Sequence, residues 1–303
     1  MALISMHWSK STRVKCSAYA DRNFDWAARL KFETHKAPPS YVIGSVLSNR
    51  FVVGQLSKRG IYGRYRGTLL GLVWSFITPL LMLGIYTFVF GSILQIKWPD
   101  QGGGSLEFAA ILFSGMLIHS LFAECLTQAP TLILANPQYV KKMIFPLESL
   151  VWVTLATAVF QAVISVVILV FYLLLVGRDV SWTVLLFPIP LAGLCLFCIG
   201  VGWLVSAIGV FVKDIAQVTG LLSTVLFFMA PILYPKTALP EQIQTFLYLN
   251  PITFPIEQFR VLVLWGQTPD WIGLGLYFSA AFVFAWATLA WFQKVRTGFA
   301  DVL

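Results

Sequence analysis

Six long, nearly charge-free apolar stretches constrain this chain more than any other feature. A bilayer core is about 30 Å thick and needs roughly 20 helical residues to cross it, and each stretch is long enough. The stretches are too long, and too apolar on all sides, to be strands of a membrane barrel. The sequence therefore predicts an all-α polytopic membrane protein with six transmembrane helices, within Leu69–Leu94, Phe108–Leu134, Leu150–Val176, Val184–Val212, Ile215–Tyr234 and Trp271–Phe292.

The basic residues indicate how the chain crosses the membrane. Most of the 21 Lys and Arg precede the first stretch or fall in loops on the same side of the membrane. The other side receives four, which are Lys97, Arg178, Lys236 and Arg260. Because cytoplasmic loops carry an excess of basic residues, we expect both termini in the cytoplasm. The net charge of +8 then reflects topology and attraction to anionic lipid, and not nucleic-acid binding.

The chain divides into three predicted regions. Residues 1–44 are expected to form a cytoplasmic amino-terminal extension of unknown role. Residues 45–67 alternate apolar and basic side chains at helical spacing, which is typical of an amphipathic helix lying in the inner headgroup region. Residues 68–303 are expected to form the six-span membrane domain.

The loop between the second and third stretches predicts a short helix at a cytoplasmic tip. Asn136 is suited to the N-cap, Pro137 to the first helical position, and the lysines to the carboxyl end, where the helix dipole favours cations. Such a helix is a good contact for a soluble partner, although an ordinary interfacial turn remains an alternative. The candidate contact residues are Asn136, Pro137, Gln138, Tyr139, Val140, Lys141 and Lys142.

After the fifth stretch come two apolar runs that are too short to cross a bilayer, Leu239–Leu249 and Phe254–Trp265. Their lengths predict a re-entrant pair of helices over residues 239–265, which dips in from the outer face and returns. A pair resting on the outer surface is the alternative. If this pair of helices forms an outer gate, the candidate gate residues are Asn250, Pro251, Glu257 and Arg260.

The sequence lacks the usual signatures of an enzyme. It has no G-x-x-x-x-G-K-[ST] phosphate loop, no H-E-x-x-H and no G-x-S-x-G. Cys195 and Cys198 form a C-x-x-C in the middle of the fourth stretch, where small packing residues are the simpler interpretation. His119 and Glu124 lie in the second stretch, but their spacing puts them on different helix faces. They offer weak support for a stand-alone channel or an ion-coupled carrier.

Aromatic residues make up 15% of the chain. Aromatic faces stack on sugar rings, so a channel lined with aromatic side chains would let a polysaccharide slide through it. Anchoring at the membrane interfaces and ordinary packing are alternative explanations for the same residues. The candidate channel aromatics are Trp74, Tyr86, Phe90, Phe227, Phe228 and Tyr234.

Several short motifs, in order, resemble the membrane subunit of type-II ABC exporters that move lipid-linked polysaccharides such as O-antigen, teichoic acid and capsule polymers. The resemblance covers roughly residue 59 to the carboxyl end. Its motifs are Arg64-Tyr65-Arg66, Leu70-Gly71 with Trp74 and Pro79, Asn136-Pro137, Lys141-Lys142, Phe145-Pro146, Lys213-Asp214-Ile215, Pro231-Ile232-Leu233-Tyr234, Asn250-Pro251, Arg260 and Phe299-Ala300-Asp301.

The resemblance implies a homodimer that binds two copies of a separate ATPase chain in the bacterial inner membrane. ATP and Mg would then be bound by the partner, with no cofactor on this chain. The helix at 136–142 would dock on the ATPase, the amphipathic helix would border the cytoplasmic entrance, and the pair at 239–265 would form the outer gate. Arg59, Arg64 and Arg66 could attract the diphosphate of a polyprenyl-linked glycan; anchoring to lipid headgroups is the alternative.

The sequence departs from the family pattern in two places. Gly60 stands where the family usually carries an acidic residue, and the amino-terminal extension is longer than usual. An ABC exporter of a small hydrophobic drug or lipid remains an alternative to the polysaccharide exporter.

Overall fold

The computed structural model describes residues 38–39, 41–93, 105–141, 145–178, 180–238 and 240–302, all within one compact unit that spans residues 37–303. Most of the predicted extension over residues 1–44 lies outside the described residues. Every regular element in the described part is helical. The α-helices are α3 (Tyr41–Ser48), α4 (Arg50–Tyr65), α5 (Trp74–Tyr86), α6 (Ser105–Leu132), α7 (Pro137–Lys141), α8 (Ser149–Leu175), α9 (Pro188–Phe211), α10 (Ile215–Phe228), α11 (Glu241–Leu247), α12 (Thr253–Val263), α13 (Trp271–Val295) and α14 (Phe299–Val302). Short 3-10 helices cover Gly71–Val73, Trp182–Leu186, Lys236–Ala238 and Arg296–Gly298, and α5 continues into a π-helical stretch, Thr87–Ile93.

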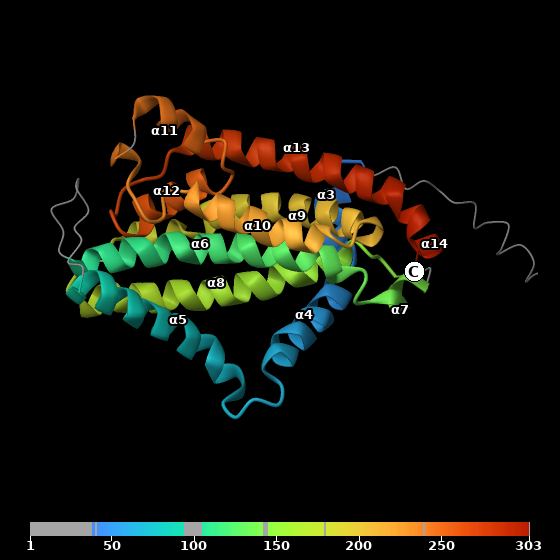
Figure 1. Cartoon of the computed structure of the whole chain (residues 1–303), viewed down its shortest axis with the longest axis horizontal. Helices are drawn as coiled ribbons and strands as arrows, with labels where there is room; N and C mark the ends of the chain where they lie inside the picture. Colours follow the sequence, from blue (N-terminus) through green and yellow to red (C-terminus); the bar gives the residue numbers. More distant parts are fainter. Residues whose placement is uncertain are drawn as a thin grey trace, which may run out of the picture. The chain divides into compact units, whose positions relative to one another are not determined.

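The long helices lie side by side, with α6 in contact with α8, α9, α10 and the outer helix α12 (Figure 1). Five helical segments are long and apolar enough to cross a membrane, as predicted for an all-α polytopic protein. They are Gly71–Phe90, Leu106–Leu132, Ser149–Leu175, Trp182–Phe211 and Trp271–Gly298.

The fifth predicted span, Ile215–Tyr234, differs from this pattern. Its helix α10 has 14 residues, which at 1.5 Å each gives about 21 Å, less than the bilayer core of about 30 Å. The chain turns after Phe228 and passes through Pro231, which lacks the N–H that a helix interior needs. The length of α10 alone therefore does not establish a sixth span.

Glycines allow the helix backbones to approach closely, as is common where membrane helices pack. A Cβ atom at Gly209 of α9 would collide with the backbone of Pro130 in α6, and one at Gly200 would lie 2.6 Å from the ring of Phe284 in α13. Cys198 on the same helix is buried in the core, and Cys195 is half-buried, as expected for packing residues.

The region predicted as one amphipathic helix over residues 45–67 consists of two helices, α3 and α4, which meet at Asn49. Helix α4 packs along α8. Gly60 faces α8 at this contact, where a Cβ atom would lie 3.2 Å from Cγ2 of Thr157. The close approach gives a physical reason for glycine where the family usually has an acid.

Candidate functional site

The chain reverses between α4 and α5 at a corner that stands away from the other helices (Figure 1). Two glycines adopt left-handed conformations there, Gly67 with φ 86° and Gly71 with φ 52°, which other residues rarely adopt. The corner encloses a hollow of about 590 Å³ that Arg59 and Arg66 line together with Tyr62 and Tyr65. Two of the three predicted entrance arginines are thus brought together at a single hollow.

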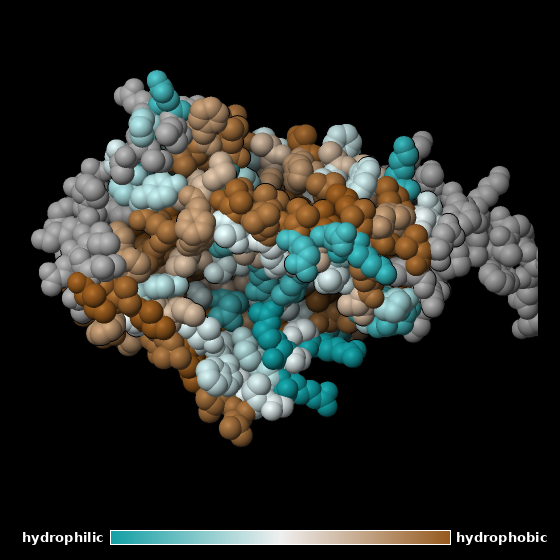
Figure 2. Space-filling model, viewed as in Figure 1, coloured by the Kyte–Doolittle hydropathy of each residue, from teal (hydrophilic) through white to brown (hydrophobic). Residues whose placement is uncertain are grey.

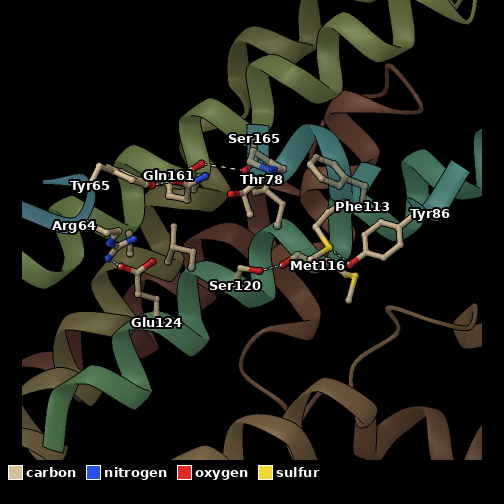
Figure 3. A pocket seen from close by; sticks show the side chains of 16 residues that line it. Arg64, Tyr65, Thr78, Tyr86, Phe113, Met116, Ser120, Glu124, Gln161 and Ser165 are labelled. Carbon is tan, nitrogen blue, oxygen red and sulfur yellow. Dashed lines mark hydrogen bonds and ion pairs between the residues drawn. The ribbon is translucent and has the colours of Figure 1, made fainter. Parts of the chain in front are cut away.

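The third predicted entrance arginine, Arg64, lies in a different cavity. This open cavity of about 300 Å³ is lined by residues of α4, α5, α6 and α8. Figure 3 shows the Arg64 guanidinium directed at the Glu124 carboxylate, with which it forms an ion pair. Their hydrogen bond raises the pKa of Arg64 above its ordinary value. Glu124 therefore pairs with a residue of the neighbouring helix α4.

The space-filling view shows hydrophilic residues gathered in a depression between α4 and the helix body, with hydrophobic surface on both sides (Figure 2). Glutamine and serine side chains on α6 and α8 continue this polar lining into the cavity of about 300 Å³. A polar depression beside a membrane helix is able to receive a polar or charged group from the bilayer interface.

A break in α5 forms one wall of this cavity. Pro79 lies inside the helix and has no N–H to bond the carbonyl of Ser75, four residues earlier. Gln161 of α8 supplies the missing donor, since its Nε2 lies 2.9 Å from that carbonyl oxygen. The Tyr65 hydroxyl in turn donates to Oε1 of Gln161 at 3.2 Å, so the glutamine connects the corner, α5 and α8 (Figure 3).

The predicted short helix between the second and third spans is present as α7, which begins at Pro137. Asn136 donates from Nδ2 to the carbonyl of Leu132 at 2.9 Å and so closes the end of α6. Gln138 is exposed, while Tyr139 is half-buried and stacks on Phe145 with ring centroids 4.3 Å apart. Lys142, and the side chain of Lys141, lie outside what the structure describes.

Next to α7 lies a buried ion pair that sequence reasoning did not anticipate. Glu148, at the start of α8, is 1% exposed, and its carboxylate lies 3.2 Å from a guanidinium nitrogen of Arg296 at the end of α13. The Tyr41 hydroxyl of α3 donates to the same carboxylate at 2.9 Å. Burial and the Glu148 charge raise the pKa of Tyr41 to about 12. The available signal was an acidic residue two positions after Phe145-Pro146, at the edge of an apolar stretch.

At the opposite end, α11 and α12 cover the end of α10. Arg260 of α12 is 2% exposed and donates to the carbonyls of Pro231 at 2.6 Å and Ile111 at 3.0 Å. Asn250 donates to the Leu226 carbonyl at 2.8 Å, and the Pro251 carbonyl accepts from Tyr277 at 3.0 Å. These residues of the predicted gate therefore hold the α10 end, α6 and α13 together.

The remaining predicted gate residue, Glu257, belongs to a more exposed cluster. Its carboxylate lies 3.3 Å from Nζ of Lys236 and accepts from the Tyr248 hydroxyl at 3.2 Å. Burial is the largest single effect on Lys236 and lowers its pKa, but the charges and hydrogen bonds of Glu257 and Tyr248 together outweigh it and raise the Lys236 pKa. Three of the four predicted gate residues thus belong to the buried group, while half-buried Glu257 pairs with Lys236 instead.

The predicted channel aromatics do not share one environment in the single subunit. Trp74 and Phe228 are exposed at 38% and 58%, and Tyr86 lines the cavity beside Arg64. The other three make contacts within the subunit: Phe90 packs on Phe108, Phe227 on His119, and the Tyr234 hydroxyl donates to the Phe228 carbonyl.

Known proteins resemble the chain over most of its length. Residues 52–264 match the family model described as ABC-2 type transporter. The "O-antigen export system permease protein RfbA" of Klebsiella pneumoniae is 24% identical over 250 residues, which cover 82% of this chain and 93% of the relative. The RfbA protein of Myxococcus xanthus is 25% identical, with 81% and 93% covered. The "Polysialic acid transport protein KpsM" of Escherichia coli is 23% identical, with 73% and 82% covered.

Proposed function

We propose that this chain, which belongs to the ABC-2 type transporter family, is the permease subunit of an ATP-driven exporter. Its substrate would be a lipid-linked polysaccharide, resembling O-antigen or a capsular polymer, that crosses the bacterial inner membrane. The similarity to O-antigen and polysialic acid transport proteins over 73–82% of the chain carries this proposal. It favours polysaccharide over a small hydrophobic drug or lipid.

ATP and Mg would be bound by a separate ATPase chain, since this sequence has no phosphate loop. Two copies of that ATPase would serve a homodimer of this chain, as the family resemblance implies. Helix α7 would dock on the ATPase, with exposed Gln138 facing the partner. Membrane lipid would surround the exposed apolar faces of the spans.

The proposed topology has six spans with both termini in the cytoplasm. Helix α10 would be the fifth span and would reach the outer side with the help of α11 and α12, which dip into the membrane as a re-entrant pair. The bonds from Arg260 and Asn250 support this arrangement. They satisfy carbonyls at the end of α10, and backbone groups at membrane depth need such partners.

Arg59 and Arg66 would bind the diphosphate of the lipid carrier at the corner. Their hollow combines two guanidinium groups with the phenols of Tyr62 and Tyr65, and guanidinium groups form strong charge-assisted hydrogen bonds with phosphate oxygens. Helices α3 and α4 would lie along the inner headgroup region beside this entrance. Closure of the ATPase would then press on α7 and move the polymer outward past α12.

A co-purification tests the proposal directly. The tagged chain is expressed with its genomic neighbours, extracted in mild detergent and separated from contaminants, and polysaccharide export is measured in a deletion strain that carries the same tagged gene. We expect a stoichiometric ATPase subunit and restored export of polymer to the cell surface. A chain that purifies alone as a stable oligomer, and whose deletion leaves surface polymer unchanged, would instead favour a channel or carrier.

A further inference from the structure

The buried ion pair beside α7 joins three parts of the chain that are far apart in sequence. The Glu148 carboxylate uses one oxygen to accept from Tyr41 of α3 and the other to bind Arg296 at the end of α13. The backbone carbonyl of Glu148 accepts from the Trp203 indole of α9 at 3.2 Å. One residue therefore connects four helices, α3, α8, α9 and α13.

The same cluster is in direct contact with the segment that follows α7. The second guanidinium nitrogen of Arg296 donates to the Phe145 carbonyl at 2.9 Å. The Phe145 ring stacks on Tyr139 of α7 with an interplanar angle of 16°. A displacement of Tyr139 thus reaches the ion pair through a single intervening residue.

The far side of the cluster is held in place by packing. Phe299 of α14 is fully buried, and its ring lies 5.6 Å from that of Phe292 on α13 and 5.9 Å from that of Phe211 on α9. Helix α14 also lies against α7 (Figure 1). The packing of α14 against α7, α9 and α13 therefore holds Arg296, which directly follows α13, in place.

A buried ion pair transmits displacement better than an apolar contact does. The attraction between apolar surfaces has no preferred direction, so it does not hold one particular pair of atoms together. A desolvated carboxylate is tolerated only while its partners stay at hydrogen-bonding distance. When the segment after α7 moves, Arg296 and Tyr41 must follow Glu148 or leave its charge unpaired.

We infer that Glu148, Arg296 and Tyr41 form the joint that transfers movement of α7 to α13 and to α3. Helix α3 leads into α4 and hence to the corner with Arg59 and Arg66, so the joint connects the ATPase contact with the entrance. These three are positioning residues and do not touch the substrate. The inference rests on the proposed function, because an ATPase must act on α7.

Glu148→Gln and Arg296→Gln test the joint in the complete complex with its ATPase, reconstituted in proteoliposomes. The glutamine in Glu148→Gln keeps the shape of the side chain, but an NH2 donor replaces one of the two oxygens that accept from Tyr41 and Arg296, and the negative charge is lost. The matched control is Glu107→Gln, which breaks an ion pair with Arg178 at the opposite end of α6 and α8. The measurements are ATPase subunits retained, rate of ATP hydrolysis, and polymer exported per ATP.

We expect both joint variants to retain the ATPase and to hydrolyse ATP within about twofold of wild type, while export per ATP falls at least tenfold. Glu107→Gln should match wild type in ATPase subunits retained, rate of ATP hydrolysis and polymer exported per ATP. Unchanged export per ATP in both joint variants would overturn the inference. If the joint variants are recovered in too small an amount, Tyr41→Phe is measured in their place, because it removes only one hydrogen bond of the joint. Unchanged export per ATP in Tyr41→Phe would also overturn the inference. A wild-type complex without ATPase or export would instead refute the proposed function.

Discussion

Gln161 is expected to replace the helix hydrogen bond that Pro79 removes, and a double-mutant cycle measures this directly. Gln161→Leu leaves the Ser75 carbonyl without its donor, and a buried unsatisfied group costs about 1–3 kcal/mol. The substitution also removes the bond from Tyr65, which contributes about 1 kcal/mol. We therefore expect the free energy of unfolding to fall by about 2–4 kcal/mol.

In the Pro79→Ala background, the new backbone N–H at position 79 is able to donate to the Ser75 carbonyl. Gln161→Leu should then cost only the Tyr65 bond, so the two substitutions should couple by about 1–3 kcal/mol. The assay is reversible unfolding in mixed detergent micelles at increasing SDS fraction. Gln128→Leu serves as a control, because Gln128 donates to Glu124 on its own helix. This substitution should lower the free energy of unfolding by the same amount in both backgrounds. An equal cost of Gln161→Leu in both would refute the reasoning.

Three further predictions concern the two ends and the corner. Tyr139→Ala combined with Lys141→Ala should reduce polymer export at least fivefold while membrane insertion, followed by fractionation, is unchanged; normal export would contradict the docking role of α7. Arg59→Ala with Arg66→Ala should abolish stimulation of ATP hydrolysis by added glycolipid but leave basal hydrolysis intact, and retained stimulation would exclude diphosphate binding at the hollow. Because the Tyr41 pKa is raised to about 12, its protonated form stabilises the folded state below pH 10, and this contribution is lost as pH rises from about 10 to 12. Tyr41→Phe should therefore show a smaller loss of thermal stability across that range than wild type, and identical losses would argue against the bond to Glu148.

The long helices could be predicted from sequence because apolar length is a local property. The end of α10 was harder to predict, because the apolar run continues through Leu233. Pro231 is a local signal for a turn, but the bonds from Arg260 and Asn250 that hold the end of α10 are not. Those partners are distant in sequence. Likewise, no periodicity connects Glu148 with Arg296.

By contrast, helical geometry could have predicted that the three entrance arginines lie at two different cavities. Arg59 and Arg66 are seven residues apart, which is nearly two full turns at 3.6 residues per turn, so they share one face. Arg64 is five residues from Arg59 and points to another side, where it meets Glu124. Grouping all three by proximity in sequence overlooked this periodicity.

Positions where a helix hydrogen bond is missing account for some of the directional contacts between helices in this protein. Inside a membrane, each backbone group released by a proline or a helix end needs a polar partner. Gln161 supplies one at Pro79, and Arg260 and Asn250 supply others where α10 ends. Each repair comes from a different helix, so each break also becomes a fixed connection between two helices. A movement of one of these helices should therefore be felt by the helix that supplies its polar partner.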